Sequence, residues 1–353
     1  MSIKFKIGNK FIGDNCKCFI VAEISANHNG KIENAIKLIK LAKKVGADAV
    51  KLQSYTPESI TLNSNKTDFL LPKNSPWSKE KTFYNLYSKS YTPLEWHADL
   101  FKEAQKNDII MFSSPFDENV VDLLEQLDTP AYKIASPEIT HIPLIKKVAL
   151  TNKPIFISTG VCDFTDLKLA IDTIKKTGND KICVLKCTSS YPSPTKEANL
   201  KTITDYRKEF NVLSGLSDHT LNNVSSIVAV GMGVSLIEKH IKFDDNDNGV
   251  DSFFSLTPSS FENMVKDIRI AEEAIGKISY SISLSAKGSI KGRRSIYISK
   301  DIKVGDTFTS KNIKVVRPSY GLHPKFYRDI IGRKAIKNLF FGDKLDWDAI
   351  KKE

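Results

Sequence analysis

Short apolar runs alternate with amphipathic helical segments eight times between residues 18 and 275, and this alternation constrains the fold more than any other feature. The helical segments, such as NAIKLIKLAKKVG, place apolar residues three and four positions apart, as helices that cover a sheet do. The alternation predicts a parallel sheet, either open and doubly wound or closed into a (β/α)8 barrel, and eight units favour the barrel. The predicted strands are 18–24, 49–54, 109–114, 131–136, 154–159, 182–188, 212–219 and 236–241.

Three further segments set the domain organisation. Residues 56–91 carry few regular signals, and we expect them to form a long loop over one end of the barrel. Residues 279–292 are rich in Ser, Gly and Lys, which is typical of a linker. Residues 293–353 return to short β-like runs and are long enough for a small β-rich domain. The predicted division is therefore a barrel at 1–278, a linker at 279–292 and a β-rich domain at 293–353.

Charge and cysteine content limit the partners and the compartment. The chain carries 52 basic and 41 acidic residues, a net charge of +11. The basic residues are scattered and form no long run, which argues against a nucleic-acid partner and is compatible with small anionic substrates. Five cysteines without disulfide-like spacing indicate reduced thiols and a cytoplasmic location. No apolar stretch is long enough to span a membrane, and the N-terminus has no apolar signal-peptide core.

Two histidines lie at the ends of the last two predicted strands. His219 and His240 are separated by one strand–helix unit, so in a barrel they would end neighbouring strands at the same mouth. Imidazoles bind Mn²⁺, Zn²⁺, Co²⁺ or Fe²⁺, and a site with two protein ligands leaves positions for water and substrate. Asp218 and Asp251 are candidates for a further ligand. The alternative is a structural role for each histidine.

Lysines, hydroxyls and a glutamate fall at other strand ends. Lys51 and Lys133, together with nearby serines, predict a pocket for a polyanion such as a phosphate. Each lysine could instead form a salt bridge with a residue of a neighbouring helix, or form a Schiff base with a carbonyl substrate. A Schiff-base enzyme needs no metal, so the two histidines argue against that chemistry. Glu23 suits a general acid or base, or a cap on the following helix.

The motifs as a set resemble one family. VAEISANHNG, ADAVKLQSYTPESITLNS, FSSPFD, AYKIASPEI, ISTG, LKCTSSYP, GLSDHT and IEKH occur in the order found in sialic acid synthases. The C-terminal SIYISKDIKVGDTFTSKNIKVVRPSYGLHPKFY resembles that family's antifreeze-like (SAF, β-clip) domain. Within the family, LQSYTPESITLNS and RPSYGLHPKFY are most similar to the branch that makes pseudaminic acid. Ser189 favours the same branch, because N-acetylneuraminate synthases have Asn in the equivalent CTxxYP motif.

The resemblance implies a (β/α)8 TIM barrel followed by an SAF domain, and a metal-dependent condensation of phosphoenolpyruvate (PEP) with an N-acylated sugar. In the pseudaminic branch that sugar is 2,4-diacetamido-2,4,6-trideoxy-L-altrose; N-acetylneuraminate and legionaminate synthases take others. It also implies a divalent cation, Mn²⁺ first and Mg²⁺ or Co²⁺ next, and a domain-swapped homodimer. A PEP-dependent synthase for sugar phosphates would need extra arginines, which the predicted strand ends lack. A carbohydrate-binding protein without catalysis would not need this set of chargeable residues.

The family's functional residues can be carried over position by position. His219 and His240 match its metal ligands, and Glu23 matches its catalytic glutamate. Arg317 matches an arginine that the SAF domain of one subunit inserts into the active site of the other. The resemblance implies catalytic roles for Lys51, Lys133, Glu138 and Asp251 as well, and substrate-binding roles for Gln53, Ser114, Ser136, Ser158, Tyr191 and Ser217.

Overall fold

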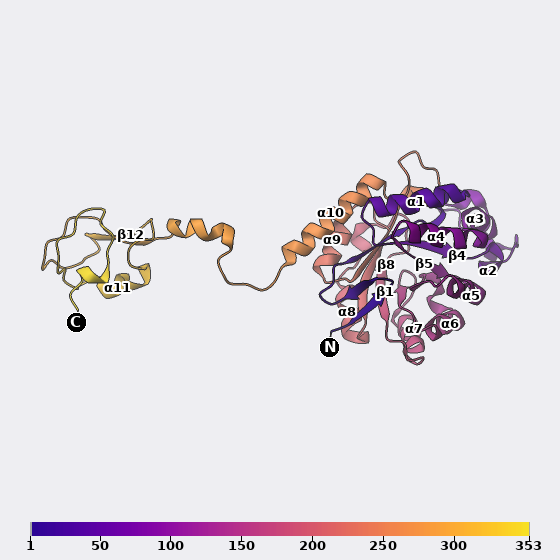
Figure 1. Ribbon diagram of the computed structural model, residues 1–353, viewed down its shortest axis with the longest axis horizontal. Coiled ribbons are helices and arrows are strands. Elements are labelled where there is room, and N and C mark those ends of the chain that lie inside the picture. Colours follow the sequence, from indigo (N-terminus) through magenta and orange to yellow (C-terminus); the bar gives the residue numbers. More distant parts are fainter. Residues whose placement is uncertain (1, 353) are drawn as a thin grey trace. The chain divides into compact units, whose positions relative to one another are not determined.

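The computed structural model describes residues 2–352 and divides into two compact units, Met1–Gly276 and Lys277–Glu353. The first unit holds a closed barrel of eight parallel strands in the order β10-β3-β4-β5-β6-β7-β8-β9, with helices outside it (Figure 1). This confirms the predicted (β/α)8 barrel. The strands are β3 (Phe19–Glu23), β4 (Ala49–Ser54), β5 (Ile110–Pro115), β6 (Tyr132–Ile134), β7 (Ile155–Ser158), β8 (Ile182–Cys187), β9 (Leu213–Asp218) and β10 (Leu236–His240).

Each strand leads to a helix that covers the outside of the barrel. Outward-facing residues of the strands, such as Ile20 of β3, pack with apolar residues of these helices, such as Leu38 and Ile39. Because both faces of each strand are buried, the strands read as nearly continuous apolar runs. The covering helices are α1 (Ile32–Lys44), α4 (His97–Lys106), α5 (Glu118–Gln126), α6 (Ile142–Leu150), α7 (Phe164–Lys175), α8 (Thr202–Phe210), α9 (Val224–Gly231) and α10 (Pro258–Ile275).

An N-terminal hairpin closes one end of the barrel. Strands β1 (Lys4–Ile7) and β2 (Lys10–Gly13) pair antiparallel. Phe5, Ile7 and Ile12 of the hairpin join the apolar side chains that fill the barrel at the N-terminal ends of its strands. The barrel is therefore blocked at that end, and a ligand can reach its interior only from the C-terminal ends of the strands.

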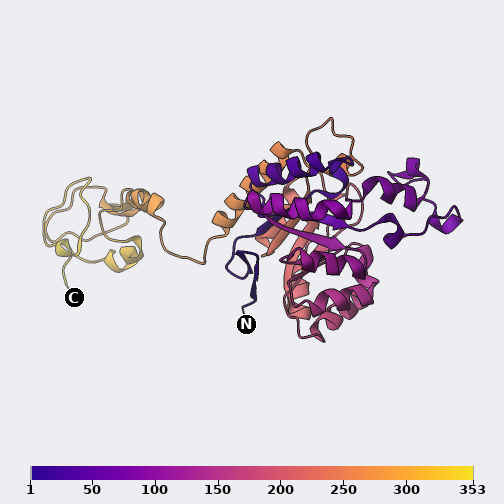
Figure 2. The same ribbon diagram turned by 45° about the vertical axis from the view of Figure 1, so that its right-hand side comes forward.

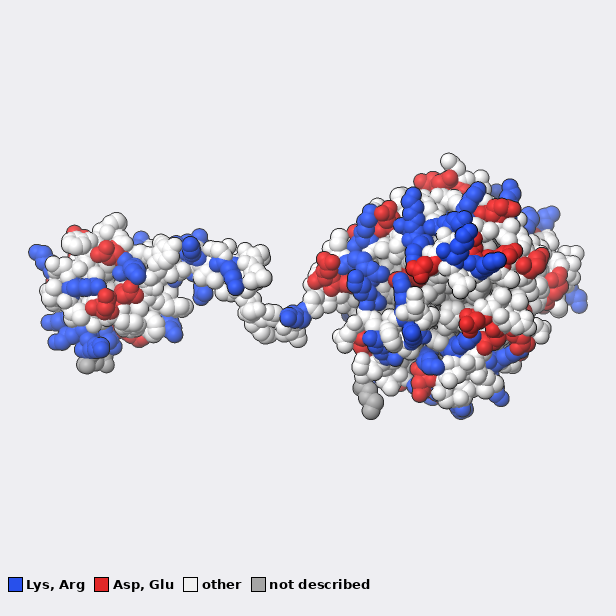
Figure 3. Space-filling model, in the orientation of Figure 1, with Lys and Arg blue, Asp and Glu red and all other residues white. Residues whose placement is uncertain are grey.

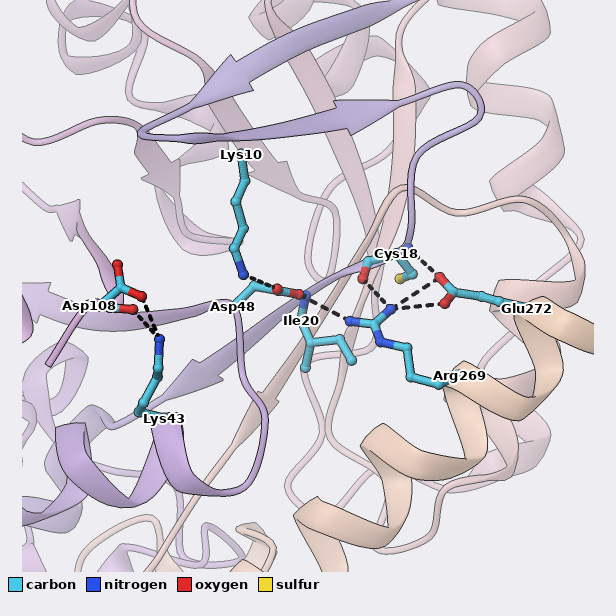
Figure 4. Close-up of polar contacts among 8 residues, drawn as sticks. All are labelled: Lys10, Cys18, Ile20, Lys43, Asp48, Asp108, Arg269 and Glu272. Carbon is cyan, nitrogen blue, oxygen red and sulfur yellow. Dashed lines mark hydrogen bonds and ion pairs between the residues drawn. The ribbon is translucent and has the colours of Figure 1, made fainter.

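Polar side chains at the blocked end bind one another (Figure 4). Asp48, just before β4, forms ion pairs with Lys10 of the hairpin and, at 3.3 Å, with Arg269 of α10. Arg269 also pairs with Glu272 at 3.0 Å and donates a 2.9 Å hydrogen bond to the carbonyl of Cys18. These charges fasten the hairpin and the last helix to the start of the barrel, so their role is structural.

The segment between β4 and α4 is more regular than its sequence predicts. It contains α2 (Pro57–Ile60) and α3 (Phe83–Ser90), and it extends away from the barrel (Figure 2). The Thr82 hydroxyl caps α3 by accepting a 3.1 Å hydrogen bond from the Asn85 amide. The sequence FYNLYSKS lacks the apolar periodicity that predicts a helix, because Leu86 is its only buried residue.

The second unit has its own apolar core, which includes Ile296, Phe308 and Leu345. It contains an antiparallel pair, β11 (Ser295–Ile298) and β12 (Ile313–Val316), and the short helix α11 (Tyr327–Ile330). The small antiparallel sheet agrees with the β-rich domain expected here. Within the predicted linker, residues Leu284–Gly292 form a 3-10 helix that the Ser/Gly/Lys-rich composition does not predict.

The described chain contains no helix that combines the length and apolarity needed to cross a bilayer. On the face of the barrel unit displayed in Figure 3, acidic side chains are interspersed among the basic ones. The positive net charge is thus distributed rather than gathered in one patch on that face.

Candidate active site

The open end of the barrel gathers the polar residues that end the strands. Side chains along a strand alternate between its two faces, so every second residue points into the barrel. Strand register places Glu23 of β3 between His240 of β10 and Lys51 of β4. Gln53, one inward position beyond Lys51, lies beside Ser114 of β5. The sequence-predicted residues of these strands therefore share one mouth.

Lys51 lies at the centre of a buried ion-pair cluster. Its ammonium contacts the Glu23 carboxylate, donates to the Ser114 hydroxyl at 3.2 Å and lies 3.6 Å from Oε1 of Glu238. Burial lowers the pKa of Lys51, but the two carboxylates raise it by more, so the ammonium stays charged. Burial also raises the pKa of Glu23 to about 7, although Lys51 opposes the shift. Glu23 is therefore placed to exchange a proton near neutral pH.

Lys133 is a second buried ammonium, only 2% exposed. Its Nζ donates to the Ile134 carbonyl at 3.2 Å, and burial lowers its pKa. Within residues 2–352, no carboxylate lies within ion-pair distance of it. On the neighbouring strand the Ser158 hydroxyl is buried without a partner, and Ser136 accepts a 2.9 Å hydrogen bond from the Gly160 amide. An anion entering here would find an ammonium without an ion-pair partner among the described residues and a hydroxyl without a hydrogen-bond partner.

The two histidines lie side by side, as predicted. Their ring centroids are 5.3 Å apart, and Phe254 packs against both. Nδ1 of His219 lies 3.2 Å from the Thr188 carbonyl, which can only accept, so Nδ1 carries a proton and Nε2 remains free to bind a cation. Burial lowers the pKa of His240 well below its usual value, and its buried Nδ1 has no hydrogen-bond partner. The donor set fits a divalent cation with two imidazole ligands.

An aromatic wall borders the histidines. Tyr191 lies 4.6 Å from His219 and 4.8 Å from Phe254, measured between ring centroids. Trp77, from the segment between β4 and α4, lies 5.5 Å from Tyr191, and its ring nitrogen donates to the Val250 carbonyl at 2.9 Å. The inserted segment thus contributes a side chain to the mouth.

Two more predicted carboxylates lie at this end. Glu138 is buried after β6, its Oε2 has no hydrogen-bond partner, and burial raises its pKa to about 7. Asp251 accepts a hydrogen bond from Ser25, which follows Glu23 by two residues, and burial raises its pKa. Arg317, by contrast, belongs to the second unit.

Unsatisfied polar atoms concentrate at the mouth. Seven buried side-chain nitrogen or oxygen atoms of residues 2–352 make no hydrogen bond. Native proteins leave few such atoms unless a ligand, ion or water meets them. Five of the seven belong to residues of the mouth: Glu23 Oε2, Glu138 Oε2, Ser158 Oγ, Glu238 Oε2 and His240 Nδ1. Of these, Glu23 Oε2 still makes the ion pair with Lys51.

Comparison with known proteins settles the family. A model described as NeuB family matches residues 38–280, and one described as SAF domain matches residues 293–351. The chain belongs to the NeuB family. This NeuB-family protein is 44% identical over 340 residues to the pseudaminic acid synthase of Campylobacter jejuni, covering 96% of this chain and 98% of the relative. It is 44% identical over 336 residues to the Helicobacter pylori pseudaminic acid synthase, covering 94% and 98%.

A solved structure agrees over the full length. The spore coat polysaccharide biosynthesis protein SpsE of Bacillus subtilis matches this NeuB-family chain with a TM-score of 0.68 and 32% identity, covering 99% of this chain and 100% of that one.

The structure corrects one candidate ligand. Asp218 points out of the barrel, where it pairs with Lys239 at 2.6 Å and accepts a 2.9 Å hydrogen bond from Ser226. Ser217 and His219 face inward on either side of it, so strand alternation excludes Asp218 from the candidate cation site of this NeuB-family protein.

Sequence reasoning also missed one residue of the mouth. Glu238 lies two positions before His240 on β10 and is 4% exposed, and its Oε1 accepts a 3.0 Å hydrogen bond from Ser217. Burial raises the pKa of Glu238, but Lys133 and Lys51 lower it by more, so it is ionised. The same alternation that places His240 in the mouth could have identified Glu238.

Proposed function

We propose that this NeuB-family protein condenses PEP with 2,4-diacetamido-2,4,6-trideoxy-L-altrose and water to give pseudaminic acid and inorganic phosphate. The observation that carries the proposal is the mouth itself, where two buried ammonium groups, the Glu23 carboxylate and a pair of imidazoles converge. The names of the 44% identical relatives from Campylobacter jejuni and Helicobacter pylori support the choice of product.

The ammonium groups suit the anionic groups of PEP. Lys133 lacks a carboxylate partner within the described chain, and Ser158 offers an unused hydroxyl, so this side of the mouth suits a phosphate or carboxylate. Lys51 with Ser114 provides a second anchor beside Glu23. Together they would hold PEP with its C3 carbon directed toward the aldehyde carbon of the open-chain sugar. Ser136 and Ser217 would add hydroxyl donors around the same ligand.

Carbon–carbon bond formation leaves positive character at C2 of PEP, and water must then add there. Glu23 would accept the proton of that water, because burial raises its pKa to about 7. The resulting tetrahedral hemiketal phosphate loses inorganic phosphate as its C2–O bond breaks. The atoms balance: PEP, sugar and water enter, and the nine-carbon acid and phosphate leave.

A divalent cation is part of the proposal. His219 and His240 would hold it, and it would supply Lewis-acid polarisation of the sugar's aldehyde. Paired imidazoles favour Mn²⁺ or Co²⁺ over Mg²⁺, and we propose Mn²⁺. The neighbouring Thr188 carbonyl fixes the ring of His219 by accepting from Nδ1.

The sugar would contact the aromatic wall and the outer carboxylates. Tyr191 and Phe254 present apolar ring surfaces to its C6 methyl group, while Gln53, Glu138 and Asp251 could bind hydroxyl and acetamido groups. Arg317 of a second copy would orient an acetamido carbonyl with its planar donors, so we also propose a domain-swapped homodimer. The chain's five cysteines are free, which fits the reducing cytoplasm that we propose as its location.

The alternative is another N-acylated sugar, which would make the protein an N-acetylneuraminate or legionaminate synthase. Incubation of the purified protein with PEP, Mn²⁺ and each purified sugar separates these functions, with products identified by mass spectrometry and NMR. We expect product from the altrose derivative and at least tenfold slower turnover of the mannose-type sugars. Preference for a mannose-type sugar would contradict the proposed substrate, and binding without turnover would indicate a carbohydrate-binding protein.

A further inference from the structure

Glu238 is enclosed in the mouth, yet no step of the proposed reaction uses it. Its side chain is 5% exposed, and its Oε2 atom has no hydrogen-bond partner. Its Oε1 atom accepts from the Ser217 hydroxyl at 3.0 Å and lies 3.6 Å from the Lys51 ammonium. A buried carboxylate so placed costs free energy unless nearby positive charge compensates it.

The contacts of Lys51 point to a role for Glu238. An ammonium has three donors, and those of Lys51 face Glu23, Ser114 and Glu238. The Ser217 hydroxyl proton is likewise directed at Glu238. An anionic ligand of Lys51 or Ser217 must therefore compete with the Glu238 carboxylate. The contact with Glu238 is the longest of the three that Lys51 makes. An incoming oxygen of PEP would therefore displace Glu238 more easily than Glu23 or Ser114.

The position of Glu238 on β10 suggests how it is released. His240 is the next inward-facing residue of the same strand, and inward neighbours on a strand are about 7 Å apart, within reach of a turning carboxylate. At equal distance, a divalent cation at His219 and His240 would attract Glu238 about twice as strongly as the singly charged Lys51 does.

We propose that Glu238 couples the cation site to the anion site. In the metal-free protein it holds Lys51 and Ser217 as an internal counter-ion, and cation binding draws it away and frees both donors for PEP. The inference rests on the proposed function, because it takes PEP as the anion. Coupling of this kind is reciprocal, so PEP also strengthens cation binding.

Isothermal titration of PEP into the full-length protein, with EDTA or with Mn²⁺ and without sugar, tests the coupling. We expect Mn²⁺ to strengthen PEP binding to the wild type at least tenfold. In Glu238→Gln the counter-ion charge is gone, so PEP should bind the metal-free variant at least tenfold more tightly than metal-free wild type. The effect of Mn²⁺ should then shrink to a few-fold. Glu272→Gln removes the same charge at the closed end and should match wild type.

A second variant guards against misfolding of the first. Glu238→Asp keeps the charge but draws it back from Lys51, so its affinity for PEP in EDTA should lie between those of wild type and Glu238→Gln. If both variants bind PEP in EDTA no more tightly than wild type does, the coupling role is wrong, while the proposed function stands. If wild type with Mn²⁺ does not bind PEP at all, the proposed function itself fails.

Discussion

The ammonium of Lys51 lies against the carboxylate of Glu23 where β3 and β4 reach the open end of the barrel. Both side chains are buried, so neither charge is screened by water. Lys51 opposes the effect of burial on Glu23, and the pKa of Glu23 settles at about 7. A carboxylate in this range can take a proton from water and release it again at neutral pH.

Glu23→Gln should therefore lower kcat for phosphate release from PEP by about 10²- to 10⁴-fold, the usual contribution of a general base. The amide keeps the size of the side chain, so circular dichroism should show a folded protein. Glu272→Gln is the matched control: it loosens Arg269 at the closed end and should lower stability but leave kcat unchanged. A Glu23→Gln variant within tenfold of wild-type kcat would remove Glu23 from the mechanism.

Substitution of Lys239 on β10 should mainly lower stability, whereas substitution of Lys133 on β6 should mainly impair PEP binding. Lys239→Met removes the ion-pair partner of the buried, outward-facing Asp218 and should destabilise the protein by about 3–5 kcal/mol. Lys133→Met removes an ammonium that has no ion-pair partner in the described part of the chain and whose pKa burial already lowers, so it should destabilise the fold less than Lys239→Met does but should abolish PEP binding. Urea unfolding and calorimetric titration of PEP measure the two effects. Similar stability losses in both variants would contradict the assignment.

Glu138 should make stability depend on pH. Its pKa is raised by burial from 4.5 to about 7, so the folded protein keeps a proton that the unfolded chain loses above pH 4.5. Stability contributed by this proton is complete below pH 4.5 and is lost as pH rises toward 7. Glu138→Gln should match wild type near pH 4 and exceed its free energy of unfolding by up to about 3 kcal/mol at pH 8. A constant difference across this range would show that Glu138 is not buried as described.

Arg317 can be tested by mixing two inactive variants. Arg317→Ala and Glu23→Gln homodimers should each be nearly inactive if both residues serve one site. If Arg317 acts on the partner subunit, random pairing of equal amounts restores about a quarter of wild-type activity, because half the dimers then hold one intact site. No recovery after confirmed subunit exchange would place Arg317 in its own subunit's site or outside catalysis.

Sequence periodicity was sufficient to predict the barrel and most of the mouth. The alternation of strands and helices predicts where strands end, and the ends of parallel strands must converge. Lys51, His219 and His240 could therefore be placed together before any coordinates. Asp218 and Glu238 show the limit of that reasoning, since it located strand ends without applying the inward–outward alternation residue by residue.

Two further features, the N-terminal hairpin and the position of Trp77, were not predicted from the sequence. The N-terminal hairpin was missed, although Gly8-Asn9 between two short apolar runs is a hairpin signal. Trp77 reaches the mouth only because the inserted segment folds back to Val250, far along the chain. No local pattern encodes that contact.

The most direct test measures phosphate released from PEP in the presence of 2,4-diacetamido-2,4,6-trideoxy-L-altrose. The protein is first treated with EDTA, then assayed with and without added Mn²⁺. We expect sugar-dependent release with Mn²⁺, almost none in EDTA, and pseudaminic acid as the product. Equal release in EDTA would contradict the cation role of His219 and His240, and no release with this or any other N-acylated sugar would contradict the proposed condensation.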